Sequence, residues 1–178
     1  MELPATIERT REISQVLEDE EFLCIRDLLL GQNRVKADVA KALLLARSSN
    51  HPSSVRLSKW FEHEENVTPR RAQDVLRQIE DPLALCLAAL VVPENIDRGL
   101  LKCASDLGNG LAKAELATKA SGMDRFALAN ESMKLGERDG FYHMFLCYAR
   151  GEGVDPAPEK TLHFCSLAAY FGHGSMIF

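Results

Sequence analysis

The sequence is poor in aromatic residues and has no long apolar run. Aromatic side chains make up 7 per cent of the 178 residues, while 46 per cent are hydrophobic, with alanine and leucine doing most of the apolar packing. The most apolar segment, ALCLAALVV at residues 84–92, is far shorter than the about 20 residues that a membrane-spanning helix needs. The opening MELPATIERTREI also lacks the basic and apolar regions of a signal peptide. Unless a longer precursor was trimmed, these absences favour a soluble cytoplasmic protein without a membrane partner.

Outside the N-terminal region, the chain also has no excess of either sign of charge. The chain has 21 basic and 26 acidic residues, a net charge of −5, and residues 1–30 hold three arginines and eight acidic residues. The remaining chain therefore carries 18 residues of each sign. An acidic beginning and a neutral remainder argue against a nucleic-acid footprint. The neighbouring Arg70 and Arg71 supply too few charges to change that conclusion.

Motifs that carry chemistry are missing as well. No glycine-rich phosphate loop follows a strand pattern, and no serine or cysteine nucleophile motif occurs. His143, Cys147, His163 and Cys165 are residue types that zinc accepts. However, His163 and Cys165 are two residues apart, so a helix would point them to different faces. We therefore expect no catalytic residue, no metal and no cofactor.

Acidic residues at 62, 64 and 65 surround His63. A carboxylate beside a histidine can form an acid–base pair. Because these residues follow a predicted helix, a solvated, charged helix end is the favoured interpretation.

The most regular segment of the chain is residues 136–172, which has the pattern of one helical hairpin. A first helix carries an apolar stripe at spacings of three and four residues, and glycines then interrupt it. Pro156 and Pro158 fit the start of a second helix, which ends at Gly172. The stripe of the first helix is Phe141, Met144, Phe145 and Tyr148, and the inner side of the second is predicted to be Leu162, Cys165, Ala168 and Ala169.

This segment resembles the Sel-one-like repeat, a relative of the tetratricopeptide repeat. The matching positions are Tyr148, Gly151, Gly153, Val154, Ala168, Ala169 and Gly172. The segment departs from the family pattern at Ala157, where the family prefers Asp, and at Thr161, where it prefers Ala. The resemblance implies an α-solenoid that binds other proteins and is not an enzyme.

The rest of the chain also divides into helices joined by short connections. Predicted starts are Thr68–Pro69 and Asp81–Pro82, each an N-cap followed by proline. The apolar helix after Pro82 is expected to be the most buried. The predicted helical ranges before residue 136 are 6–18, 20–30, 35–48, 53–63, 69–79, 82–92, 95–107, 111–120 and 124–135.

These ranges predict an all-α protein of roughly twelve helices. The expected architecture is a right-handed superhelical solenoid of antiparallel helix pairs in a single domain, 1–178. Residues 1–19 would form an N-terminal capping helix, 20–172 about five hairpin units, and 173–178 the start of a further helix. An irregular helical bundle without a true repeat is the alternative.

The five cysteines are an odd number, and each lies in a helical, apolar context. Buried free thiols in a reducing compartment are the simplest interpretation. Some secreted relatives in the family that this segment resembles use disulfides between helices, so bridges within a hairpin remain an alternative. The pairs that lie one hairpin apart are Cys86 with Cys103 and Cys147 with Cys165.

The expected function is a non-catalytic scaffold or adaptor that binds another protein or peptide on the concave face of the solenoid. By resemblance, the first helices of the hairpins line that face. A hydrolase built on the same repeats, or a nucleic-acid-binding helical repeat, are the alternatives. The candidate partner-binding residues are Arg56, Lys59 and Glu62 from one unit, and Tyr142, His143 and Arg150 from another.

The C-terminal end is expected to be apolar and uncovered, because a repeat that stops after Gly172 has no partner helix. Such a surface would pair with a second copy, forming a homo-oligomer, bind another chain, or mark the place where a longer array was cut. A tail that folds back as a cap is the alternative. The residues expected in this surface are Leu167, Tyr170, Phe171, Met176, Ile177 and Phe178.

Overall fold

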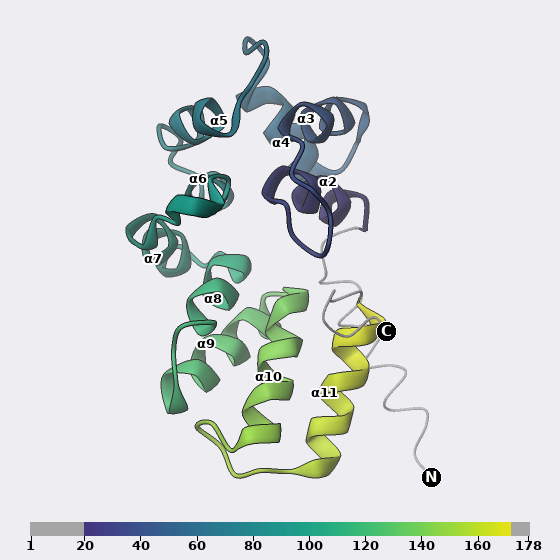
Figure 1. The fold of residues 1–178 in the computed structure, drawn as a ribbon, viewed down its shortest axis with the longest axis vertical. Coiled ribbons are helices and arrows are strands. Elements are labelled where there is room, and N and C mark those ends of the chain that lie inside the picture. Colours follow the sequence, from purple (N-terminus) through teal and green to yellow (C-terminus); the bar gives the residue numbers. More distant parts are fainter. Residues whose placement is uncertain (1–19, 172–178) are drawn as a thin grey trace. The chain divides into compact units, whose positions relative to one another are not determined.

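The computed structural model describes residues 20–171, and within this range the chain is helical without any strand (Figure 1). The all-α prediction is therefore confirmed for the described residues. The N-terminal cap predicted at 1–19 and the helix start predicted at 173–178 lie outside them. The elements are α2 (Glu20–Leu30), α3 (Val39–Ser48), α4 (Pro52–Trp60), α5 (Pro69–Leu76), α6 (Pro82–Leu90), the short 3-10 helix η1 (Pro93–Asn95), α7 (Arg98–Asp106), α8 (Gly110–Ala117), α9 (Gly122–Lys134), α10 (Arg138–Arg150) and α11 (Pro158–Tyr170).

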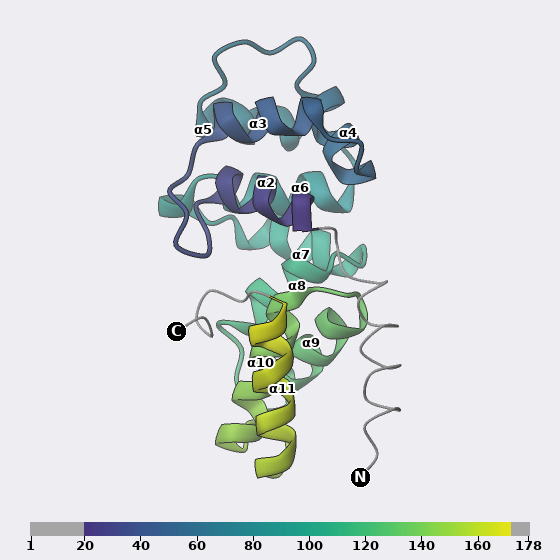
Figure 2. The same ribbon diagram turned by 90° about the vertical axis from the view of Figure 1, so that its right-hand side faces the viewer.

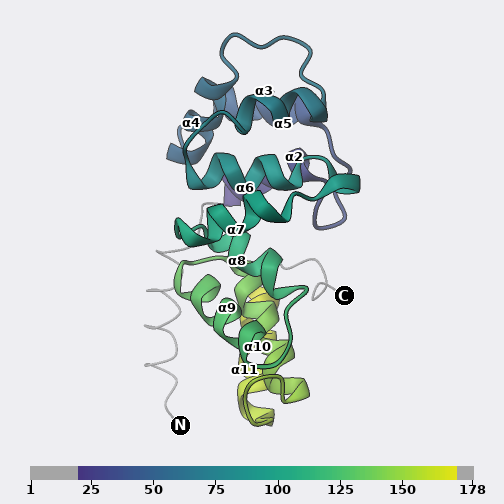
Figure 3. The ribbon, with the colours of Figure 1, turned by 90° about the vertical axis from the view of Figure 1, so that its left-hand side faces the viewer.

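The described residues fall into two compact units, 20–112 and 113–171, with the boundary inside α8. In the first unit, α3 packs against α2 and α4, and α6 packs against α5 and α7. Figures 2 and 3 show these neighbours side by side. In the second unit, α10 packs against both α9 and α11. Helices thus pack mainly on their sequence neighbours within each unit, as predicted.

Side-chain caps fix several helix starts. Thr68 Oγ1 accepts a hydrogen bond from the Arg71 amide at 3.2 Å, and Pro69 follows in the first turn, as predicted. Asp81 caps α6 in the same way. Two further caps move predicted boundaries: Asp38 starts α3 at Val39 instead of 35, and Asp97 starts α7 at Arg98 instead of 95.

The core of residues 20–112 is built around α6, which is buried on nearly all sides, as predicted from its apolar sequence. Gln73 of α5 is also buried, and its Nε2 donates to the Ala88 carbonyl oxygen at 2.8 Å. This hydrogen bond satisfies a polar side chain inside an apolar contact. The α5–α6 pair is therefore held by both packing and a buried polar contact. The buried residues of α6 are Leu83, Ala84, Cys86, Leu87, Ala88, Ala89 and Leu90.

Glycines set the close contacts of residues 113–171. Gly151 ends α10 in the left-handed conformation, with φ at 71°. A Cβ on Gly140 would lie 2.5 Å from the Met133 backbone nitrogen, so α10 approaches the end of α9 closely at this glycine. A Cβ on Gly153 would overlap the carbonyl of Gly122. Gly153, in the turn between α10 and α11, therefore allows contact with the start of α9 as well as a turn.

The apolar stripe predicted for α10 is largely confirmed, but the inner face predicted for α11 is wrong in part. Phe141, Met144 and Tyr148 are buried. On α11, Leu162 is 69% exposed and Ala169 is exposed, whereas Ala168 is buried as predicted.

The face of α11 that turns toward α10 carries its larger side chains. Phe164 stacks on Tyr148 with ring centroids 5.6 Å apart, and Leu167 is buried. Because larger apolar side chains bury more area, this face covers α10 instead of the smaller-residue stripe. The spacing of apolar residues along α11 is compatible with either face, so it could not decide which one packs against α10.

The expected uncovered C-terminal surface is smaller than predicted in the described residues. Leu167 is buried, and the Phe171 ring stacks on Phe141 at 5.2 Å. Tyr170 is 71% exposed. The other predicted members, residues 176–178, lie outside the described residues, so pairing of two copies through this end stays a prediction.

None of the five cysteines, all of which lie in the described residues, forms a disulfide, but fewer are buried than expected. Cys86 and Cys147 are buried, Cys165 is half-buried, and Cys24 and Cys103 are exposed. Cys24 and Cys103 occupy the outward side of amphipathic helices. Apolar neighbours in the sequence therefore do not determine whether a cysteine side chain faces the core or the solvent.

Candidate functional site

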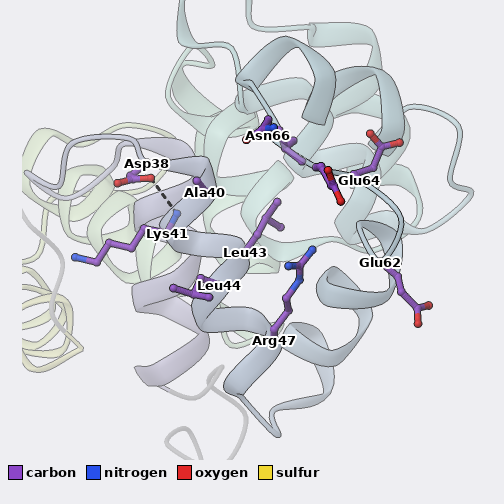
Figure 4. A pocket seen from close by; sticks show the side chains of 11 residues that line it. Asp38, Ala40, Lys41, Leu43, Leu44, Arg47, Glu62, Glu64 and Asn66 are labelled. Atoms are coloured by element: carbon purple, nitrogen blue, oxygen red, sulfur yellow. Dashed lines mark hydrogen bonds between the residues drawn. The ribbon is translucent and has the colours of Figure 1, made fainter.

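An open groove lies between α3 and the segment that joins α4 to α5 (Figure 4). Its volume is about 670 Å³. All of its lining residues belong to the compact unit 20–112, so its geometry is set within one unit. The lining residues are Asp38, Ala40, Lys41, Leu43, Leu44, Arg47, Glu62, Glu64, Glu65, Asn66 and Val67.

The α3 wall of the groove presents an apolar stripe with a cationic end. Ala40, Leu44 and Arg47 recur at spacings of four and three residues, so they share one side of the helix. Leu44 is 66% exposed, while the neighbouring Leu43 is buried and joins α3 to the core. Figure 4 shows the Leu43 and Arg47 side chains directed toward the opposite wall. This wall therefore leaves an exposed leucine beside a guanidinium group.

The opposite wall, residues 62–67, is fastened to the helices on both sides. Arg47 Nη2 donates to the Phe61 carbonyl oxygen at 3.3 Å. Arg71 in the first turn of α5 donates through Nε to Glu64 Oε2 at 2.8 Å and through Nη2 to Oε1 at 2.5 Å. A two-point arginine–carboxylate pair fixes orientation as well as charge. The wall is thus positioned from α3 at one end and from α5 near its middle.

The same contact shifts the proton affinity of both partners. The hydrogen bond from Arg71 lowers the pKa of Glu64 below its usual value, and the Arg71 charge acts in the same direction. Correspondingly, the pKa of Arg71 is raised, chiefly by its hydrogen bond to Glu64. Glu64 is therefore ionised and paired at neutral pH.

Some acidic side chains of the groove have partners within the chain and others do not form an ion pair in the described residues. Asp38 accepts the Lys41 amide at 2.9 Å as the cap of α3, and Glu64 is paired with Arg71. Glu62 and Glu65 are exposed and have no ion pair with any residue in the described range. After these contacts are taken into account, two carboxylates remain open on the 62–67 wall.

Three sequence-predicted contact residues, Arg56, Lys59 and Glu62, lie on or just after α4 and are exposed. Arg56 is engaged within the chain, because its Nη1 lies 2.7 Å from Asp81 Oδ2 and its guanidinium lies 6.0 Å from the Trp60 ring centroid. Of the three, only Glu62 lines the groove.

The other three candidates lie on α10, in the second unit. His143 is only 7% exposed, and Tyr142 is half-buried against the core that contains Phe141. Both lose surface because α10 packs against two helices instead of one. Arg150 is exposed, with its Nη1 3.8 Å from Glu152 Oε1. His143 therefore offers little surface to a partner in this conformation.

Sequence reasoning missed Leu44, Arg47 and Glu65 as groove residues. One signal for Leu44 was present in the apolar segment ALLLA at residues 42–46. Five consecutive helical residues cover more than a full turn, so one of the leucines had to face away from the core. Nothing in the local sequence indicated that Arg47 lines the groove, because its position depends on a hydrogen bond to the Phe61 carbonyl oxygen, 14 residues away.

The described residues contain no cluster of three or more His, Cys, Asp or Glu side chains arranged to hold a metal ion. None of the helices in this range is both long and apolar enough to cross a membrane. No protein-family model, curated protein or solved structure matches the chain. The resemblance of residues 136–172 to the Sel-one-like repeat therefore rests on the residues quoted for it alone.

Proposed function

We propose that this chain is a non-catalytic protein-binding module and that it holds a peptide segment of its partner in the groove between α3 and residues 62–67. The exposed Leu44 in this groove is the observation that carries the proposal. Other leucines of the chain are exposed as well, but Leu44 lines a groove, where it supplies an apolar anchor bordered by charged side chains.

The shape of the groove favours a peptide over a small molecule. Its volume of about 670 Å³ lies in the range of roughly 300–1,000 Å³ that is common for ligand sites. However, small-molecule sites enclose most of the ligand, whereas this groove is open to solvent along its side. An extended segment can lie across an open groove while the rest of the partner stays outside.

We also propose that the helices form a solenoid of Sel-one-like repeats. Three observations support it: packing between sequence neighbours, the left-handed Gly151 at the hairpin, and the close approach of Gly153 to Gly122. In solenoids, each repeat covers its neighbour and leaves a surface for partners. A cytoplasmic location would suit cysteines that form no disulfide.

The proposal can be tested by selecting ligands from a random peptide library displayed on phage. Selected peptides are then measured against the parent chain and against Leu44→Glu. We expect Leu44→Glu to weaken binding more than about tenfold, because an apolar anchor is replaced by a charge.

Leu107→Glu is the matched control. Leu107 is 58% exposed, belongs to the same unit and does not line the groove. Circular dichroism should show that both variants retain the parental helicity. Failure to select any peptide, or equal losses in the two variants, would contradict the proposed function.

A further inference from the structure

We infer that the groove selects peptide segments in which a lysine or arginine lies within two residues of a bulky apolar side chain. This inference rests on the proposed function and specifies its ligand. The apolar side chain would contact Leu44. The basic side chain would reach Glu65 and the outer edge of the 62–67 wall, where the Glu62 side chain extends away from α3 (Figure 4).

Charge complementarity favours a basic ligand. Four of the lining residues are acidic and two are basic, and both basic residues belong to α3, so the negative charge of the 62–67 wall is what a basic ligand side chain would meet. Asp38 and Glu64 are already engaged, in the cap of α3 and in the pair with Arg71. Glu62 and Glu65 are the carboxylates left exposed on this wall. A basic ligand side chain would therefore meet two carboxylates that have no competing ion pair in the described part of the chain.

The length of the α3 wall limits the size of the recognised segment. Ala40 and Arg47 are seven residues apart, which corresponds to about 10 Å along a helix. An extended chain rises about 3.3 Å per residue, so roughly three to four peptide residues span this wall. A basic residue more than two positions from the apolar anchor would extend past the groove.

Arg47 supplies a contact that does not depend on ligand side chains. One of its nitrogens already donates to the Phe61 main-chain carbonyl, and its side chain reaches toward the 62–67 wall (Figure 4). A guanidinium group has five N–H donors, so further donors remain for a main-chain carbonyl of the peptide. Its positive charge also disfavours a cationic side chain beside α3 and directs that side chain toward the 62–67 wall.

The test compares two double variants that remove the same number of charges. Glu62→Gln with Glu65→Gln removes the open carboxylates of the groove. Glu80→Gln with Glu94→Gln removes two exposed carboxylates of the same unit outside the groove. The probes are the basic-apolar peptides selected on the parent chain, measured by calorimetry at low and high salt.

We expect the Glu62/Glu65 variant to lose at least about threefold in affinity at low salt, and the Glu80/Glu94 variant to bind like the parent. High salt should shrink the difference, because exposed charges are screened. Peptides that depend on Leu44 but show no basic enrichment, or equal binding by both double variants, would overturn this inference and leave the proposed function standing. The absence of any Leu44-dependent peptide would overturn both.

Discussion

Arg56 and Asp81, 25 residues apart in sequence, join α4 to the start of α6 through an ion pair of 2.7 Å. Asp81 uses its other oxygen to accept the amides of Leu83 and Ala84 at 2.8 and 3.2 Å. One carboxylate therefore caps a helix and ties it to an earlier one. Arg77 and Asp97 repeat this relationship between α5 and α7, with an ion pair of 2.7 Å and a cap on Leu100. Within the described residues, these two helix starts thus also link α6 to α4 and α7 to α5.

The two roles of Asp81 can be separated by substitution. Asp81→Ala removes both cap and pair, and we expect a cost of about 1–2 kcal/mol. Asp81→Asn keeps a capping oxygen and removes the charge, so its cost should stay below about 1 kcal/mol, because Arg56 is exposed. Urea unfolding measures both values. Equal losses in the two variants would show that the cap contributes nothing.

Gly140 provides a test of close helix packing in the second unit. Gly140→Ala should lower stability by roughly 1–3 kcal/mol, because its Cβ would meet the Met133 backbone. Gly99→Ala is the matched control on α7, where the nearest atom is the Asp97 Oδ1 at 3.3 Å. There the higher helix propensity of alanine should leave stability unchanged or raise it by up to about 1 kcal/mol. Thermal unfolding that ranks the two variants the other way would contradict the described α9–α10 contact.

Neighbouring alanines of α11 test which face is buried. Ala168 is fully buried and Ala169 is exposed. Ala168→Leu should therefore overpack the contact with α10 and cost roughly 1–3 kcal/mol. Ala169→Leu should change stability by less than about 0.5 kcal/mol. If both substitutions destabilise equally, α11 has the orientation predicted from sequence instead of the one described.

Thiol reactivity should divide the cysteines into classes. In the native protein, the exposed Cys24 and Cys103 should react first and Cys165 more slowly. Cys147 should react only after unfolding, because burial, with Glu152 adding to it, raises the pKa of its thiol; buried Cys86 should do the same. Colorimetric titration with Cys24→Ser and Cys103→Ser assigns the fast phase. Fewer than five thiols in the denatured, unreduced protein would reveal disulfides.

The Glu64–Arg71 contact should make the groove wall sensitive to acid. The pKa of Glu64 is lower in the folded chain than the usual value of 4.5. The contact therefore contributes to folding stability at pH values above 4.5, and this contribution is lost as the pH falls through the pKa of the folded state. The stability difference between the parent and Glu64→Gln should therefore shrink as the pH is lowered below about 4.5. Carboxyl chemical-shift titration measures the folded pKa directly. A Glu64 pKa at or above 4.5 would contradict the described pair.

The sequence carried strong information about helix boundaries and less about which surface is used. Thr68–Pro69, Asp81–Pro82 and Gly151 act through local chemistry, so their patterns could be recognised without knowing the fold. Asp38 was not identified as a cap, because the apolar pattern continued upstream to Val35. Local signals therefore set boundaries well where a cap and a proline coincide.

The groove depends on contacts that no local pattern contains. Arg47 reaches Phe61 over 14 residues, and the 62–67 segment takes its position from a pair with Arg71. Sequence reasoning placed Glu62 among candidate contacts but assigned Arg56 the same role, although Arg56 is paired with Asp81. Tertiary partners decide which charged residue is open to a ligand and which one joins two helices.

The most direct test of the account is a methyl NMR titration of the chain with the tightest selected basic-apolar peptide. We predict that the methyl signals of Leu43, Leu44 and Val67, which line the groove, shift in proportion to bound peptide. The signals of Leu107 and Leu162, exposed elsewhere, should stay in place. Shifts centred on Leu107 or Leu162 with Leu44 unchanged would contradict the proposal that the groove between α3 and residues 62–67 is the binding site.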